Sequence, residues 1–306
     1  MNQLLVKKDI SLQISREEFL EDVGCLFEVL QTSYGMYDYF GHERFVAARA
    51  AVIHRLNEVP FDARNAVSVL KNEFTSFIKD GHFRIGVADP ADPVSDFAVR
   101  HTDFHGIPMI VCRKFWYDSR EEQKQLEQFA ASYTAYRDAE TLIIDVRDNP
   151  GGSDVYIWDF LKGLYGAEPD YPCRYVQRNS ALFREYAATW DLTSRPDLEQ
   201  TECDGVRIPS RRRIYVLINE GTASSGESAI AYLKTIDNTV VVGDHSAGCF
   251  TCGNCMTVYL PHSHLPIYFG TGMVLYEKTR NMDAEGGFRG DISYEAFAER
   301  IAPISP

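Results

Sequence analysis

The sequence has no long hydrophobic run, because nowhere do 18 uncharged apolar residues follow one another. A membrane-spanning helix needs about 20 predominantly apolar residues, so none is expected here. The N-terminal stretch MNQLLVKKDISLQI has no apolar segment after its lysines, and we therefore expect no secretory signal. Together these absences predict a soluble protein of the cytoplasm with no membrane partner.

Positive charge is also scarce. The chain has 31 Lys and Arg against 44 Asp and Glu, a formal net charge of −13. A surface of that sign repels phosphate groups, so nucleic acid and anionic membranes are not expected as partners. The seven cysteines are an odd number in a 306-residue chain, which is too long to be a small disulfide-stapled scaffold. We therefore expect reduced thiols.

The N-terminal part of the chain reads as helical, and the rest alternates between strands and helices. Apolar residues recur at helical spacing in three early segments, which predicts helices over 15–34, 42–59 and 62–79. Continuous apolar runs such as LIIDV, IYVLI and TVVVG are typical of buried parallel strands joined by crossover helices. We therefore predict a helical subdomain over 1–82 and an α/β core over 83–306.

Within that core the pattern predicts individual elements. The predicted strands are 83–87, 107–112, 141–146, 214–219, 239–243, 256–260 and 273–276. The predicted helices are 119–136, 153–165, 223–235 and 294–301. The polar segment 180–212 has no clear periodicity and is expected to be a long loop or lid.

Three short motifs are candidates for chemistry. In TLIIDVRDNPGGSD (141–154), a buried strand runs into two glycines, whose main-chain N–H groups suit either an oxyanion cradle or a plain turn. In IYVLINEGTASSGESAIAYLKT (214–235), Ser224 and Ser225 fall at a helix start, where a serine is either a nucleophile or an ordinary helix cap. In FIKDGHFRI (77–85), His82 is either a general base or a structural histidine.

The segment GDHSAGCFTCGNC (243–255) carries cysteines at C-x2-C-x2-C spacing: Cys249, Cys252 and Cys255. Such a run is able to ligate an iron–sulfur cluster, with histidines such as His245 as additional ligands. However, alternating apolar residues from Met256 onward predict a strand, on whose approach cysteines serve as small apolar residues. We expect neither a metal nor a cofactor.

The order of these motifs, IIDVRDNPGG followed by VLINEGTASSGE and VVVGD, resembles the tail-specific (C-terminal processing) serine peptidase family, tricorn core included. The resemblance extends from about residue 77 to 292. It implies a ClpP/crotonase-like core of parallel-strand βα units. The region 84–140 is too short for the PDZ domain that many members carry, which favours the tricorn-core-like branch without one.

The resemblance also implies the site. Ser224 matches the family's nucleophile, and the N–H of Ser225 would supply one oxyanion donor. The N–H of Gly151 or Gly152 would supply the other. One branch uses a Ser–Lys dyad, but Cys249 occupies the place of that lysine.

The other branch takes its base from a D-G-H segment, which corresponds to His82, with His245 as a competing candidate. Its acid comes from a C-terminal segment that matches DAEGGFRGD (283–291), where Glu285 is favoured and Asp283 is the reserve. The implied mechanism is acyl transfer, in which His82 deprotonates Ser224 and the acid orients the imidazole.

The predicted function is therefore a serine peptidase of the Ser-His-Glu type, acting on a peptide or an unfolded protein, with self-association into a homo-oligomer left open. Three alternatives remain. The first is a catalytically silent homologue that binds a peptide or small ligand. The second is an enzyme that acts on acyl-CoA thioesters with a related fold. The third is a metalloprotein whose metal is bound by the cysteine run.

Overall fold

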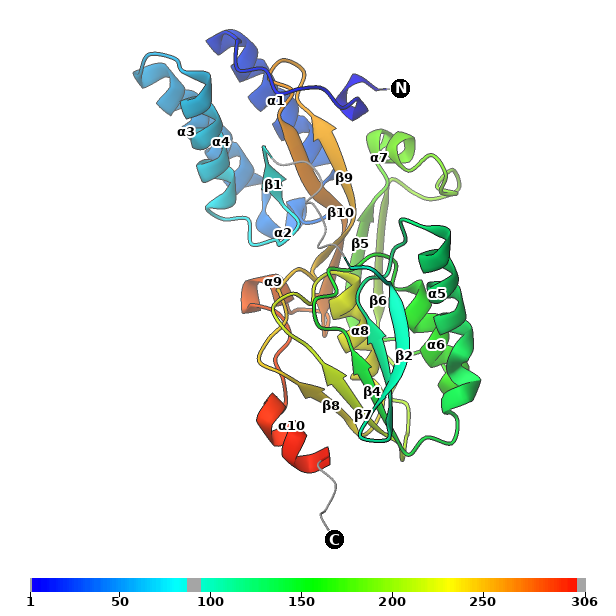
Figure 1. Cartoon of the computed structure of the whole chain (residues 1–306). Helices are drawn as coiled ribbons and strands as arrows, with labels where there is room; N and C mark the ends of the chain where they lie inside the picture. The colour runs from blue at the N-terminus through cyan, green and yellow to red at the C-terminus, as the bar shows by residue number, and fades with distance from the viewer. Residues whose placement is uncertain (1, 87–94, 302–306) are drawn as a thin grey trace. The chain divides into compact units, whose positions relative to one another are not determined.

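The computed structural model describes residues 2–86 and 95–301, and the chain divides into two compact units (Figure 1). The first unit contains the described parts of Met1–Ala91, with Tyr175–Thr201 and Cys252–Val274. The second contains the described parts of Asp92–Arg174 and Leu275–Pro306, with Glu202–Thr251. No helix in the described ranges combines the length and apolar character needed to cross a membrane.

The helices of the first unit form where the apolar periodicity predicts them. They are α1 (Arg16–Ser33), α2 (Tyr37–Phe40), α3 (His42–Glu58) and α4 (Ala63–Thr75), preceded by the short 3-10 helix η1 (Gln3–Leu5). Helix α1 begins with a capping box, in which the side chains of Ser15 and Glu18 each accept a main-chain N–H of the other residue. Helix α4 ends at Thr75, four residues before the predicted end.

A five-stranded sheet lies largely in the first unit, in the order β1-β10-β5-β6 with β9 also paired to β10. Its strands are β1 (Arg84–Ile85), β5 (Cys173–Arg178), β6 (Leu198–Cys203), β9 (Cys252–Tyr259) and β10 (Pro266–Tyr276). The segment predicted as a loop or lid over 180–212 instead contains α7 (Ala181–Tyr186) and β6. Of the predicted strand 83–87, only 84–85 is strand, and Val87 lies outside the described residues.

The cysteine run also differs from the prediction. Strand β9 begins at Cys252 rather than at Met256, so two of the three cysteines belong to the strand itself. Antiparallel pairing places Cys252 opposite Met273 and Cys255 opposite Gly270. Cys252 is 3% exposed, which fits the interpretation of cysteine as a small core residue.

The sheet of the second unit has the order β2-β3-β4-β7-β8. Its strands are β2 (Val99–Phe104), β3 (Ile107–Cys112), β4 (Thr141–Asp145), β7 (Arg213–Leu217) and β8 (Thr239–Val242). Strands β2 and β3 form an antiparallel hairpin, whereas β3, β4, β7 and β8 run parallel. The prediction of a mixed α/β fold is thus confirmed.

The helices described in the second unit are α5 (Arg120–Ala131), α6 (Val155–Tyr165), α8 (Ser225–Leu233), α9 (Met282–Glu285) and α10 (Tyr294–Ile301), with the 3-10 helix η2 (Ser132–Tyr136) after α5. Helices α5 and α6 lie together, with the rings of Phe129 and Phe160 stacked 4.9 Å apart. Phe297 of α10 packs on Tyr215 and other strand residues of the core.

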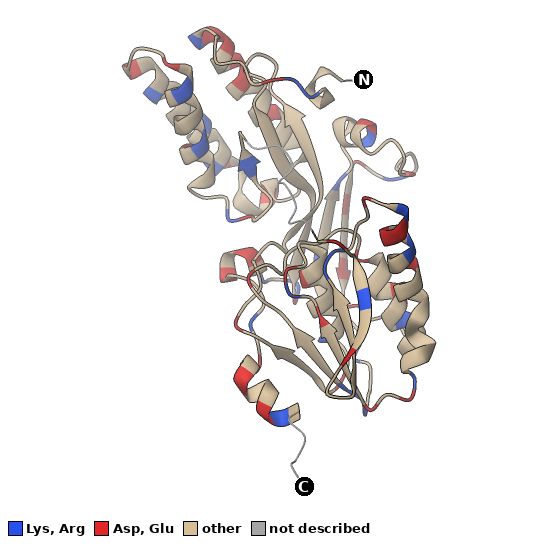
Figure 2. Cartoon of the chain, in the orientation of Figure 1, with Lys and Arg blue, Asp and Glu red and all other residues tan. Residues whose placement is uncertain are grey.

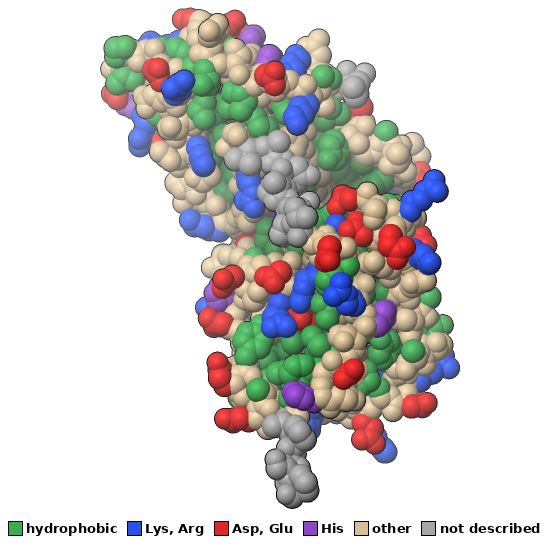
Figure 3. All heavy atoms as spheres, in the orientation of Figure 1, with side chains coloured by type: hydrophobic (Ala, Val, Ile, Leu, Met, Phe, Trp, Pro, Cys, Tyr) green, Lys and Arg blue, Asp and Glu red, His purple; other side chains and the backbone are tan. Residues whose placement is uncertain are grey.

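The surface agrees with the acidic composition. Figure 2 shows Asp and Glu spread over helices and loops of both units rather than gathered on one element. Figure 3 shows hydrophobic side chains gathered on one face of the second unit, beside a group of Lys and Arg side chains.

The parallel strands position the candidate site. Their carboxyl ends lie at one edge of the sheet, and the loops that follow β4, β7 and β8 begin there. The loop after β4 carries Gly151 and Gly152. The loop after β7 carries Ser224 and leads into α8 at Ser225, and the loop after β8 carries Cys249. In open α/β sheets, ligands bind outside the carboxyl ends of the strands, so this edge is the place to look for a site.

Candidate active site

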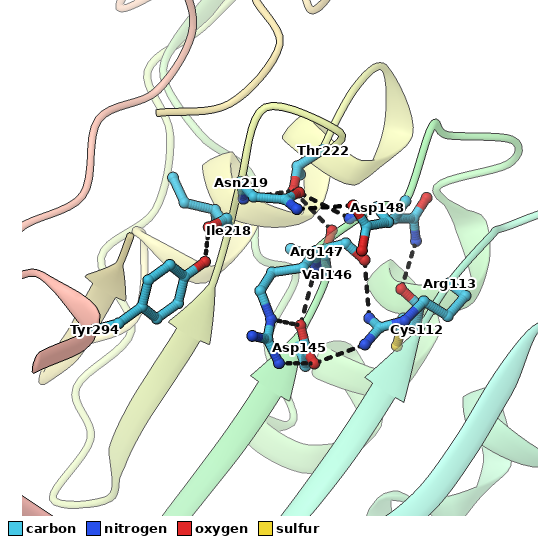
Figure 4. Close-up of polar contacts among 11 residues, drawn as sticks. Cys112, Arg113, Asp145, Val146, Arg147, Asp148, Ile218, Asn219, Thr222 and Tyr294 are labelled. Carbon is cyan, nitrogen blue, oxygen red and sulfur yellow. Dashed lines mark hydrogen bonds and ion pairs between the residues drawn. The ribbon is translucent and has the colours of Figure 1, made fainter. Parts of the chain in front are cut away.

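A buried ion cluster fixes the end of β4 (Figure 4). Arg113 Nη2 donates to Asp145 Oδ2 at 2.9 Å, while Arg147 Nη2 and Nε donate to Asp145 Oδ2 and Oδ1 at 2.7 and 2.8 Å. Burial disfavours the ionised form of Asp145, but the hydrogen bonds from Arg147 and Arg113 outweigh it and lower the pKa of this carboxyl. The cluster therefore holds the start of the loop that carries the two glycines.

The next residues tie that loop to the one after β7. Asn149 is fully buried, its Nδ2 donates to the Cys112 carbonyl, and its Oδ1 accepts the N–H of Gly151 at 2.9 Å. The Asn149 carbonyl accepts the N–H of Ala223 at 2.8 Å. Figure 4 shows a second tie, because Thr222 Oγ1 donates to the Val146 carbonyl.

Ser224 has a conformation that few residues other than glycine adopt. It is the N-cap of α8, with φ 52° and ψ −123°. Its side chain makes no capping hydrogen bond, and its N–H donates to the Cys249 carbonyl at 3.1 Å. The capping interpretation is therefore wrong for Ser224, and a strained serine at a strand-to-helix turn is the arrangement that exposes a nucleophilic Oγ.

The two glycines lie against this serine. A Cβ built on Gly151 would be 3.0 Å from Ser224 Oγ and 3.1 Å from the N atom of Ser225, and the glycine has φ 121°. Gly152 has φ 122°, and its carbonyl accepts a hydrogen bond from Ser225 Oγ at 2.8 Å. The structure thus brings all four residues together, and any side chain at 151 would fill the space above Ser224.

The predicted base lies in the first unit. The His82 side chain is buried, and its Nδ1 is 3.8 Å from Asp80 Oδ1. The main-chain N–H of His82 donates to the same oxygen at 2.8 Å. Tyr34 OH donates to the other oxygen of Asp80. The Asp80 side chain is fully buried, and this burial raises its pKa despite the hydrogen bonds it accepts.

The two candidate acids both belong to α9 but lie in different surroundings. Glu285 is exposed, and its carboxylate is bound by Nε and Nη2 of Arg280. Asp283 is half-buried, and its Oδ1 accepts the N–H groups of Phe250 and Thr251, each at 2.7 Å. The competing histidine, His245, is half-buried, and its Nδ1 is hydrogen-bonded to the Ser246 carbonyl.

A buried acid that the sequence reasoning missed lies in the first turn of α8. Glu227 is fully buried and accepts hydrogen bonds from Ser246 Oγ, the Gly248 N–H and the Cys249 N–H. The sequence did contain a signal, since Glu227 is the one charged residue among SGESAIAYL. A charge inside a helix of otherwise small and apolar residues is retained only with specific partners.

Comparison with known proteins gives the chain a family. The model of "Peptidase family S41" matches residues 100–293, well over half of the chain. The matched range includes both glycines and Ser224, and it begins after His82. None of the curated proteins matches.

Several solved structures share the fold. They include a peptidase from Parabacteroides merdae described as putative (16% identity, 89% of this chain and 88% of that one, TM-score 0.53). The photosystem II D1 C-terminal processing protease matches at 12% identity over 92% and 94%, with a TM-score of 0.53. Mature CPAF matches at 13% identity over 90% and 92%, with a TM-score of 0.59. The resemblance to tail-specific peptidases is thus confirmed, and the chain belongs to peptidase family S41.

Proposed function

We propose that this chain is an active serine peptidase with Ser224 as its nucleophile. The observation that carries the proposal is the conformation of Ser224, which has a positive φ at the start of α8 and no capping role for its hydroxyl. Backbone strain of this kind persists only where surrounding contacts hold it, and it gathers at functional sites. A Cβ at position 151 would lie 3.0 Å from Ser224 Oγ. Because Gly151 has no side chain, that space beside the hydroxyl is left for a substrate carbonyl.

The oxyanion formed in the reaction would be bound by main-chain N–H groups. Ser225 is the first residue of α8, where N–H groups have no partner within the helix. Of the two glycines, Gly152 is the better second donor, because the N–H of Gly151 is already bound by Asn149. The bond from Ser225 Oγ to the Gly152 carbonyl holds the two segments in register. Loss of one such donor typically costs ~3 kcal/mol of transition-state stabilisation.

The base and acid are also proposals. His82 would take the proton of Ser224, since Cys249 stands where a Ser–Lys enzyme would have its lysine. Glu285 is the acid favoured by the sequence, but its carboxylate is exposed and paired with Arg280. The half-buried Asp283 is the stronger candidate on these contacts, because a less hydrated carboxylate interacts more strongly with an imidazolium.

The remaining features follow the family resemblance. We assign the fold to the ClpP/crotonase-like group. Within the family, we assign the chain to the tricorn-core-like branch without a PDZ domain. We place the domain boundary between a helical subdomain (1–82) and the core (83–306). A peptide or unfolded protein is the proposed substrate. The supporting observation is the parallel sheet whose carboxyl edge carries Ser224 and the two glycines.

A fluorophosphonate probe tests the nucleophile directly. The wild type should be labelled and should cleave an unfolded protein such as casein, Ser224→Ala should do neither, and Ser228→Ala on the same helix is the matched control. Loss of cleavage in His82→Ala but not in His245→Ala would support the base, and comparing Asp283→Asn with Glu285→Gln would assign the acid. An unlabelled wild type that binds peptides tightly would instead identify a catalytically silent binder.

A further inference from the structure

The buried acid Glu227 binds the loop that follows β8. Its Oε1 accepts Ser246 Oγ and the Gly248 N–H at 3.1 Å, and its Oε2 accepts the Cys249 N–H at 2.7 Å. All three donors come from one four-residue stretch, and the carboxylate that receives them is 0% exposed. Burial raises the pKa of Glu227 to about 7 and the negative charge of Asp283 adds to the rise, while the three hydrogen bonds oppose it.

Asp283 continues the same pattern along the loop. Its Oδ1 accepts the N–H groups of Phe250 and Thr251, so the four successive N–H groups of 248–251 are all bound by carboxylates. Four consecutive main-chain donors held in this way fix the path of the loop, because each charge-assisted bond is stronger than a neutral one. The loop cannot slide or rotate without leaving a buried carboxylate short of donors.

The loop held by Glu227 touches the proposed nucleophile through its main chain. The N–H of Ser224 donates to the Cys249 carbonyl, and the N–H of Ala247 donates to the Thr222 carbonyl. The main chain of Cys249 is therefore bound at both of its polar groups: its N–H donates to Glu227, and its carbonyl accepts from the N–H of Ser224. These contacts close a ring through α8, since Glu227 is three residues after Ser224 on the same helix.

We propose that Glu227 is a positioning residue for Ser224: it fixes the Ser246–Cys249 loop, whose Cys249 carbonyl holds the Ser224 main chain in its strained conformation. The inference rests on the proposed function of Ser224 as nucleophile. It differs from a purely structural role because it predicts that breaking the contact changes the reactivity of Ser224. Glu227 itself takes no part in the proposed transfer of the Ser224 proton.

The first experiment reads the contact without requiring catalysis. Amide hydrogen exchange is measured at residues 248–251 in a Ser224→Ala background, with and without Glu227→Gln. Glutamine has the same shape, but one of its two acceptor oxygens is replaced by an NH2 group that faces a main-chain donor, so exchange at Gly248, Cys249 or both should accelerate about tenfold. Exchange at Phe250 and Thr251 should change less, because Asp283 still binds them. Unchanged exchange at all four residues would overturn the proposal.

The second experiment reads reactivity with Ser224 intact. In Glu227→Gln, the rate constant for fluorophosphonate labelling should fall about ten- to a hundredfold, the range expected for a misplacement of about 1 Å. The kcat for peptide cleavage should fall with it, while KM changes less than about twofold. Glu227→Asp keeps the charge and should recover part of the rate, and it provides a second test if the glutamine variant does not fold. Glu220→Gln, an exposed acid in the loop before the serine, is the matched control.

The outcomes separate the two hypotheses. A wild type that is not labelled refutes Ser224 as the nucleophile, and the positioning role fails with it. If the wild type is labelled and both Glu227 variants react at the wild-type rate, only the positioning role is wrong. Accelerated exchange at Gly248 and Cys249 together with wild-type reactivity also refutes it, because the loop would then be held without affecting the serine.

Discussion

The burial of Glu227 predicts a specific pH dependence of stability. Its pKa in the folded protein is about 7, against an ordinary value of 4.5, and desolvation is the largest cause. A carboxyl whose folded pKa is raised binds a proton more tightly in the native state than in the unfolded state. Its contribution to stability is therefore full below pH 4.5 and is lost as the pH rises through 7.

The magnitude follows from the two pKa values. They differ by about 2.5 pH units, and each unit corresponds to about 1.4 kcal/mol, so the total is roughly 3 to 4 kcal/mol, most of it lost between pH 5 and 8. The groups that act on Glu227 are the carboxylate of Asp283, which raises its pKa, and the donors at Ser246, Gly248 and Cys249, which lower it. The thiol of Cys249 belongs to the same loop and is unchanged between the wild type and the variant Glu227→Gln.

The assay is equilibrium urea unfolding at pH 5, 6, 7 and 8 for the wild type and Glu227→Gln. Ionisable groups that do not interact with Glu227 contribute equally to both proteins, so they cancel in the difference between the two pH profiles, which leaves Glu227 together with its interaction with Asp283. Between pH 5 and 8, the wild type should lose roughly 2 to 3 kcal/mol more than the variant. Glu299→Gln, an exposed acid on α10, serves as the control. Coincident profiles for wild type and Glu227→Gln would refute the argument that this carboxyl is desolvated.

Three further changes have expected outcomes. Gly151→Ala should abolish labelling of the proposed nucleophile, because the new Cβ would lie 2.6 Å from the serine Cβ, whereas Gly166→Ala, at φ 67° with nothing within 4 Å, should cost stability alone. Asp145→Asn should lower the free energy of unfolding by about 3 kcal/mol in urea titration, since it leaves two arginines without their buried partner, while Glu168→Gln in an exposed pair should change it by less than about 1 kcal/mol. Phe297→Ala should cost about 3 kcal/mol, measured by calorimetry, because it empties the contact between α10 and the sheet; an unchanged melting temperature would contradict that packing.

Much of the fold could be predicted from local patterns. The helices α1, α3 and α10 and the central strands β4 and β7 have strong periodicity or continuous apolar runs, and each forms within about two residues of the predicted range. Three strands were missed: β2, β5 and β6. Strand β2 (VRHTDF) is exposed along most of its length and β6 (LEQTEC) is similar, so neither shows the apolar alternation on which the prediction depends. Pairing with neighbouring strands stabilises them, and pairing is not visible in a single sequence.

In the candidate site, too, local features could be predicted from the sequence and long-range contacts could not. The types of residue were predictable, because glycines after a strand and serines at a helix start have local signatures. Their contacts were not, since the approach of Gly151 to Ser224 depends on β4 and β7 being neighbours in the sheet. Glu227 was missed for a related reason: its partners Ser246, Gly248 and Cys249 are about twenty residues away. Two of them bind it through main-chain N–H groups, which leave no residue-type signal.

Main-chain hydrogen bonds hold the loop after β8 in place. Ala223 N–H binds the Asn149 carbonyl, Ala247 N–H binds the Thr222 carbonyl, and Ser224 N–H binds the Cys249 carbonyl. Such bonds connect the three loops at the sheet edge whatever side chains they carry, so a cysteine at 249 need not disturb the backbone around the serine. Glu227 is different, because its contribution comes from a side chain. Substitution of the exposed Ala247, whose N–H binds the Thr222 carbonyl, should therefore be better tolerated than substitution of Glu227, the buried carboxylate that binds the loop.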